Sequence, residues 1–256
     1  MTRGLLRCIS IPGRSQVEMK QVKVEVMFRC FRFFPTDDQS LQAVRFVSIS
    51  RIRKAYRCPH AYLMLLDSLD AIDGNGVTAA AKVLRRAREA GMITAVDCVS
   101  QPGETFRQVV TSALAEADLL FINEFEIGQV LERDVPSERG MMEAAALELA
   151  SQAPREETQV IVHAVTGAVV ARRDGVLAAH PSLALPDAEI AGATGAGDAF
   201  ASGFLLGVHD GLDSIQCLRL AACAAGMSLR DPTPSGGILA LEDCLALGER
   251  RAWRDF

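Results

Sequence analysis

After position 60, the chain alternates short apolar runs with segments in which apolar residues recur every three or four positions. The short runs predict buried strands at 62–66, 92–97, 118–123 and 159–163. The first longer segment predicts a helix whose apolar face carries Val77, Ala80, Ala81, Leu84 and Ala87. A hairpin is predicted over 168–177, and further helices at 104–117, 124–132, 138–152, 198–209, 213–229 and 241–248.

This alternation of strands and helices indicates a fold class. Strands separated by helices of this length predict an α/β protein, with a mostly parallel sheet covered by helices on both faces. In such folds, ligands bind beyond the carboxyl ends of the strands. We therefore expect the functional side chains directly after the predicted strands.

The first 58 residues follow neither period and differ in composition. They hold 12 of the 27 Lys and Arg residues, only 4 of the 32 Asp and Glu residues, and 2 of the 20 glycines. The shift predicts a boundary near Pro59, with a basic segment at 1–58 and a core at 59–256. Three interpretations stay open for the segment: an arm that binds RNA or an anionic surface, two edge strands at 22–26 and 44–50, or an aberrant segment, for instance one read in a shifted frame.

Composition excludes several classes of function. A net charge of -5 argues against a dedicated nucleic-acid binder. No apolar run approaches the roughly 18 residues of a membrane span, and no signal peptide is recognisable at the start. The seven cysteines form no C-x-x-C pair and no zinc-like cluster. We interpret them as reduced, mostly buried thiols, which predicts a cytoplasmic protein.

The candidate chemistry is concentrated in the segment A-T-G-A-G-D-A-F, residues 193–200. The chain contains no P-loop, no dinucleotide-binding G-x-G-x-x-G and no G-x-S-x-G elbow. A loop of Gly195, Ala196 and Gly197 that enters a helix would direct free N–H groups toward an anion. Asp198 would then be placed to take a proton from an attacking hydroxyl, although a plain helix N-cap explains an aspartate there equally well.

The same segment resembles the second signature of the ribokinase-like, or PfkB, carbohydrate kinases, [ST]-G-A-G-D-x-F-x-x-G. Thr194, Gly195, Ala196, Gly197, Asp198, Phe200 and Gly203 all match it. The resemblance implies that the glycine loop is an anion hole for the transferred phosphoryl group and that Asp198 is the general base. Gly192 stands where this family usually has Asp or Asn.

Two further segments resemble the family at the ends of predicted strands. In N-E-F-E, Asn123 and Glu126 match an N-x-x-E motif that is implied to organise Mg²⁺ and its waters around ATP. In H-A-V-T-G-A, Gly167 is implied to face the nucleotide, and His163 either reaches a phosphate or is simply packed. Thr194 is included among the residues that bind ATP, and Asp97 is a candidate for supporting the metal.

The resemblance covers about 60–256 and implies a three-layer α-β-α ribokinase-like core. It implies an enzyme that uses ATP and Mg²⁺ to phosphorylate a hydroxyl of a sugar-like small molecule. The family's N-terminal strands and β lid, with their Gly-Gly pair, have no counterpart in 1–58. The alternative is therefore a nucleotide-binding remnant or regulatory module without an acceptor site. A homodimer is compatible with the resemblance, and no membrane or nucleic-acid partner is expected.

Overall fold

The structure is a computed structural model that describes residues 44–48, 57–233, 236–237 and 239–256. Its strands are β1 Val44–Ser48, β2 Arg57–Leu63, β3 Ala95–Cys98, β4 Leu119–Asn123, β5 Gln159–His163, β6 Gly167–Arg172 and β7 Gly175–Pro181. Its helices are α2 Asp67–Asp70, α3 Ala79–Glu89, α4 Phe106–Leu114, α5 Glu124–Leu131, α6 Arg139–Gln152, the 3₁₀ helix η2 Asp187–Glu189, α7 Ala196–His209, α8 Ser214–Ser228 and α9 Leu241–Arg250.

The described strands form one sheet in the order β1-β2-β3-β4-β5-β6-β7, so neighbours in the chain are also neighbours in space. The centre is parallel, from β2 through β3 and β4 to β5. Both edges are antiparallel, because β1 pairs with β2 in that sense and β6 and β7 form a hairpin on β5. The carboxyl ends of β2, β3, β4 and β5 therefore meet at one edge of the sheet.

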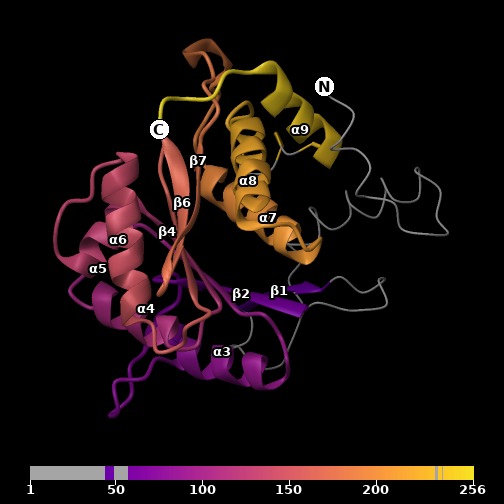
Figure 1. Cartoon of the computed structure of the whole chain (residues 1–256). Coiled ribbons are helices and arrows are strands. Elements are labelled where there is room, and N and C mark those ends of the chain that lie inside the picture. Colours follow the sequence, from indigo (N-terminus) through magenta and orange to yellow (C-terminus); the bar gives the residue numbers. More distant parts are fainter. Residues whose placement is uncertain (1–43, 49–56, 234–235, 238) are drawn as a thin grey trace.

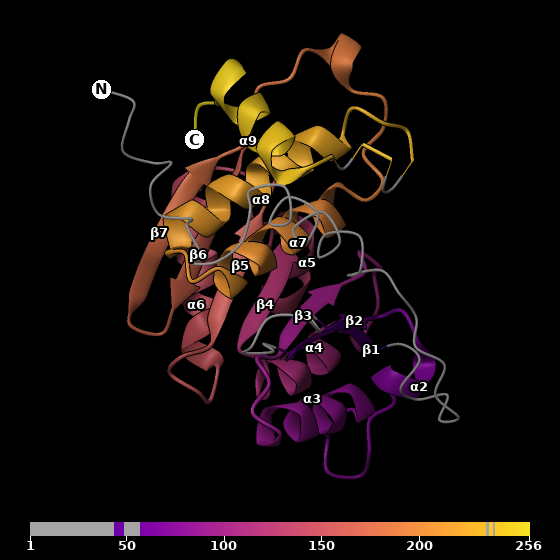
Figure 2. The ribbon, with the colours of Figure 1, turned by 90° about the vertical axis from the view of Figure 1, so that its right-hand side faces the viewer.

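Helices cover both faces of this sheet, with α3 to α6 on one side and α7 and α8 on the other (Figures 1 and 2). The strand residues alternate between the two layers. Val96 and Leu120 belong to the apolar cluster under α3 to α6, whereas Ala95 and Phe121 belong to the cluster under α7 and α8. This period of two confirms the predicted α/β fold with three layers.

The α7 and α8 helices pack closely because glycines line their contact. A Cβ atom at Gly203 would lie 2.9 Å from Ala221 Cα, and one at Gly207 would lie 2.7 Å from Cys217 Sγ. Small residues at such positions let two helix backbones approach each other. The contact holds α7, which carries the predicted glycine loop at its first turn, close against α8.

The predicted strand at 62–66 differs most from the structure. The strand β2 begins earlier, at Arg57, and ends at Leu63. Met64 has a positive φ of 61°, and its N–H donates to Asp70 Oδ1 at 3.1 Å, so the chain turns away from the sheet. The apolar run was therefore a strand end followed by a turn and α2, and β2 crosses the predicted boundary at position 59.

The expectations for the N-terminal segment are tested only in part. A strand predicted at 44–50 is present as β1, at the edge of the sheet. The strand predicted at 22–26 and most of the basic segment lie outside the described residues. Among the described residues, Cys98, Cys217, Cys223 and Cys244 are buried free thiols. In the described part of the chain, no helix is both long and apolar enough to cross a membrane.

Candidate active site at the carboxyl edge of the sheet

Four polar side chains stand at the ends of the parallel strands on the face toward α7. Tyr62 of β2 is in register with Asp97 of β3, and Asn123 of β4 is in register with His163 of β5. Ala95, Phe121 and Ile161 pack into the cluster under α7 and α8. They lie two positions before Asp97, Asn123 and His163, respectively. Side chains two positions apart share a face of a strand, so the polar groups point to the same side.

The glycine loop before α7 faces these strand-end side chains. The helix α7 begins at Ala196, after an N-cap Gly195 whose φ of 85° is one that glycine adopts readily. Asp198 lies in the first turn and is partly exposed. The Tyr62 hydroxyl donates a hydrogen bond to Asp198 Oδ1. Asp198 is therefore not the N-cap of its helix, and its carboxylate faces the strand ends.

The backbone of the loop is partly engaged within the protein. The Ala196 N–H donates to the Ala193 carbonyl at 3.2 Å, so it is not free as the sequence had suggested. Among the described residues, the N–H groups of Gly195, Gly197 and Asp198 have no backbone acceptor. Those of Gly197 and Asp198 belong to the first turn of α7, at the positive end of its dipole, and are available to an anion.

Asn123 and Glu126 form a reciprocal cap at the start of α5. The Asn123 side chain accepts from the Glu126 N–H at 2.8 Å, and Glu126 Oε2 accepts from the Asn123 N–H at 2.9 Å. The Ser100 hydroxyl joins them, because it donates to Glu126 Oε1 at 2.6 Å and accepts from Asn123 Nδ2 at 2.9 Å. The carboxyl group of Glu126 is thus held in place at both oxygens. Burial is the main cause that raises its pKa.

Asp97 is the penultimate residue of β3, and the charges of Glu126 and Asp198 both act on it. It is 6% exposed, and its Oδ1 accepts from the Cys98 N–H at 2.8 Å. Burial raises the pKa of Asp97 well above its usual range, and the negative charges of Glu126 and Asp198 raise it further. Three acidic groups therefore repel one another at this edge, which is an environment that a cation would stabilise.

His163 packs beside the glycine loop. Its ring stacks on Phe200 of α7, with the ring centroids 5.1 Å apart and the planes at 29°. A Cβ atom at Gly197 would lie 3.7 Å from His163 Cε1, so the ring is in contact distance of the loop. Burial lowers the pKa of His163 to about 4, which keeps the imidazole neutral at physiological pH. The packed role and contact with a phosphate are both compatible with this position.

The two remaining predicted residues are Thr194 and Gly167. Thr194 is exposed in the loop before α7. Gly167 begins β6 and is buried, and the space of a side chain there is filled by the His180 carbonyl and the Phe256 ring, each 2.7 Å from an ideal Cβ. Close packing therefore explains the glycine, and its contact with a nucleotide stays a prediction.

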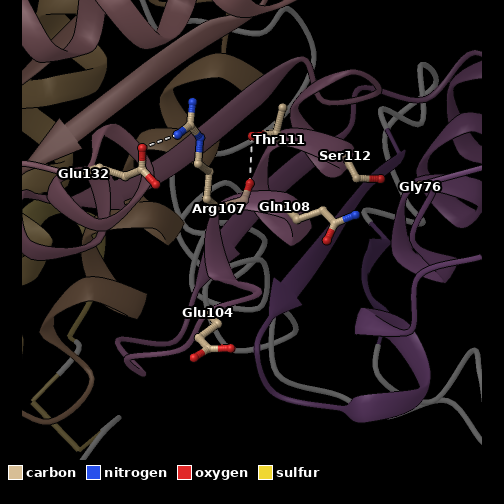
Figure 3. Close-up of a pocket in the computed structure, with 7 residues that line it drawn as sticks. All are labelled: Gly76, Glu104, Arg107, Gln108, Thr111, Ser112 and Glu132. Carbon is tan, nitrogen blue, oxygen red and sulfur yellow. Dashed lines mark hydrogen bonds and ion pairs between the residues drawn. The ribbon is translucent and has the colours of Figure 1, made fainter.

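A separate hollow of about 460 Å³ opens beside α4, away from the candidate site (Figure 3). Arg107 and Glu132 form an ion pair across it, and Gln108 and Ser112 also line it. None of the predicted site residues is among its lining residues. In the described ranges, no three His, Cys, Asp or Glu side chains are grouped so that they could hold a metal ion by themselves.

The order of these motifs along an α/β core matches a known family. A profile of the pfkB family of carbohydrate kinases matches residues 54–238. This chain belongs to the pfkB family. The match begins just before β2 and includes the glycine loop, the Asn123 and Glu126 pair and Asp97.

The sequence identity to individual members of the family is low. The pfkB chain is 28% identical to adenosine kinase of Saccharomyces cerevisiae over 131 residues, which cover 51% of the chain and 38% of the relative. Ribokinase of Arabidopsis thaliana with ribose and ATP superposes with a TM-score of 0.57 at 19% identity, over 74% of this chain and 55% of that one. An E. coli structure described as a ribokinase II with ATP and Mg²⁺ gives 0.56 at 19% identity, over 75% and 58%. The chain thus spans only about half the length of its structural relatives.

Two residues of this pfkB site were missed from the sequence, Tyr62 and Ser100. Ser100 follows the predicted strand at 92–97, which is the signal that could have found it, whereas Tyr62 is the first residue of the predicted strand at 62–66 and carries no such signal. Neither belongs to one of the recognised motifs. Their partners, Asp198 and Glu126, are 136 and 26 residues away in the chain.

Proposed function

We propose that this protein transfers the γ-phosphoryl group of ATP to a hydroxyl of a sugar or a sugar-like small molecule, with Asp198 as the general base. The observation that carries the proposal is the position of Asp198. It lies in the first turn of α7, directly after the glycine loop and facing the strand ends. Membership of the pfkB family supports the reaction class.

The proposed chemistry uses two adjoining parts of α7. The Asp198 carboxylate accepts the proton of the acceptor hydroxyl as the hydroxyl oxygen attacks phosphorus. The N–H groups of Gly197 and Asp198 donate to the phosphoryl oxygens, where negative charge is concentrated during transfer. Since both groups belong to one rigid helix end, the base and the anion hole keep a constant relation to each other.

The acidic residues also fit the Mg²⁺ that the family implies. The side chains of Asp97, Asn123 and Glu126 offer carboxylate and amide oxygens, which suit a hard cation. Burial and the negative charges of Glu126 and Asp198 raise the pKa of Asp97, and a bound cation would favour its charged form. We propose that Asn123 and Glu126 hold Mg²⁺ through waters, with Asp97 in support. When bound with ATP, Mg²⁺ neutralises charge on the phosphates.

A second function stays in competition, that of a nucleotide-binding remnant or regulatory module. It is favoured by residues 1–58, which contain no Gly-Gly pair like that of the family's N-terminal strands and lid. Phosphoryl transfer needs both substrates held in line, and residues that would grip an acceptor are not recognisable in this sequence. A remnant of this kind would bind Mg-ATP without passing on its phosphoryl group.

One experiment separates the two functions. ADP release is measured over a panel of sugars and nucleosides, and the thermal shift with Mg-ATP is measured in parallel. Acceptor-dependent ADP release that falls about 10²–10⁴-fold in Asp198→Asn, with an unchanged Mg-ATP shift, supports the kinase. A Mg-ATP shift with no acceptor-dependent ADP release supports the remnant. Equal activity of Asp198→Asn and wild type contradicts the role of the base.

A further inference from the structure

The contact between Tyr62 and Asp198 joins two segments that meet only through the fold. Tyr62 belongs to β2, and Asp198 lies 136 residues later in the first turn of α7. The phenol donates to Oδ1 of the carboxylate. A neutral hydroxyl that bonds a carboxylate satisfies one of its oxygens and restricts rotation about the side chain. The contact thus bears directly on the group proposed as the base.

The position of Tyr62 is determined by the backbone on both sides. In β2, His60 pairs with Ala95 and Tyr62 pairs with Asp97, which directs the ring toward the α7 layer. Directly after the strand, Met64 adopts a left-handed conformation with φ 61°. A residue other than glycine is strained in that region and stays there only when its surroundings require it.

The side chain of Asp70 holds Met64 in this conformation. Its Oδ1 accepts from the Met64 N–H at 3.1 Å, and α2 supplies the Asp70 position. The strained turn therefore ends β2 at Leu63 and keeps Tyr62 at the edge of the site. Strained backbone of this kind is common where a functional group has to be held in one orientation.

We propose that Tyr62 is a positioning residue for the base, an inference that rests on the proposed function. With Oδ1 bonded to the Tyr62 hydroxyl, Oδ2 is the oxygen presented to the acceptor. The acceptor O–H proton passes to Oδ2 while the acceptor oxygen forms its bond to the γ-phosphorus. The bond from phosphorus to the bridging oxygen breaks, and its electron pair leaves with ADP. Tyr62 keeps its own proton throughout.

The test compares Tyr62→Phe with wild type in steady-state kinetics. Loss of the hydroxyl leaves Asp198 free to rotate, so kcat for acceptor phosphorylation is expected to fall about tenfold. The KM for ATP stays unchanged, because the phenol contacts the base and not the phosphate-binding amides. Leu65→Ala is the control: Leu65 is 52% exposed in the same turn, and its variant keeps both constants. An unchanged or increased kcat in Tyr62→Phe overturns the proposal.

A second measurement examines the contact independently of catalysis. The melting temperatures of Tyr62→Phe, Asp198→Ala, which removes the acceptor oxygen, and the double variant are compared with that of wild type. Because the two groups are bonded, the double variant is expected to shift Tm by less than the sum of the single shifts. Additive shifts overturn the contact. A wild type that phosphorylates no acceptor contradicts the proposed function, whereas an active wild type with an equally active Tyr62→Phe contradicts only the positioning role.

Discussion

The Ser100 hydroxyl lies 2.6 Å from Glu126 Oε1, and this bond connects the segment after β3 to the first turn of α5. The same hydroxyl accepts from Asn123 Nδ2 at 2.9 Å. Ser100 thereby links both residues of the N-x-x-E motif, Asn123 and Glu126, by hydrogen bonds. Outer groups of this kind determine the orientation of the groups that bind a metal or its waters.

Replacement of Ser100 by alanine is expected to weaken Mg-ATP binding. Without the hydroxyl, Glu126 loses a bond at Oε1 and Asn123 loses one at Nδ2, so both side chains gain freedom. We expect the apparent KM for Mg²⁺ to rise about 10-fold or more, with a smaller change in kcat. Titration of activity against Mg²⁺ at saturating ATP measures the effect. Ser151→Ala on the exposed face of α6 is the matched control and should behave as wild type.

Asp97 is expected to make the protein less stable at neutral pH than an uncharged residue would. Its folded pKa is raised, first by burial and then by Glu126 and Asp198, so its favourable contribution is present at low pH and is lost as the pH rises through the folded value. In Asp97→Asn the amide oxygen can still accept from the Cys98 N–H. The variant should therefore melt at a higher temperature than wild type at pH 7 without Mg²⁺.

Calorimetry from pH 4 to pH 8 examines this trade between stability and function. The gain in Tm should shrink toward pH 4, where Asp97 is protonated, and should also shrink when Mg²⁺ and ATP are added. Acceptor-dependent activity is expected to fall in the same variant. A lower melting temperature for Asp97→Asn at pH 7 would show that the carboxylate is already compensated within the protein.

Local patterns in the sequence were sufficient for most of the fold. The helix α3 is recognisable because Ala80, Ala81, Leu84 and Ala87 recur at helical spacing, and all four are buried. The end of β2 was predicted wrongly because Y-L-M-L-L reads as a continuous apolar strand. The turn at Met64 depends on a bond from Asp70, and an apolar pattern does not report such a bond.

The same division applies to the candidate site. Asn123 and Glu126 were predicted from their resemblance to the family's N-x-x-E motif, and the reciprocal cap that they form lies within four residues. Asp198 was predictable because the glycine loop precedes it directly. Tyr62 and Ser100 act on these residues through contacts that span 136 and 26 positions, so only the folded chain brings them together. The engaged Ala196 N–H likewise depends on a turn whose form the residue types leave open.

Gly203 is expected to be required for the contact between α7 and α8. A methyl group there would lie 2.9 Å from Ala221 Cα and 3.0 Å from the Leu220 carbonyl, so one backbone has to move. Gly203→Ala should therefore lower the free energy of unfolding by about 1–3 kcal/mol. Urea denaturation measures it, with Gly140→Ala as the control. Gly140 lies in α6 with no atom within 4 Å of an added Cβ, so that variant should be unchanged or up to about 1 kcal/mol more stable.

His163 is expected to make the protein sensitive to mild acid. Its folded pKa is lowered by burial from 6.5 to about 4, so between these values the unfolded chain binds a proton that the folded protein does not. Stability therefore falls as the pH drops through this window, by about 3 kcal/mol for this group. His163→Gln loses the stacking on Phe200 and should be less stable at pH 7, but it lacks this titration. The raised pKa values of Asp97 and Glu126 have the opposite effect on stability as the pH falls, but they act in both proteins. The quantity to compare is therefore the difference in urea unfolding free energy between wild type and variant. It should shrink from pH 7 to pH 4, and a constant difference would contradict the neutral, buried imidazole.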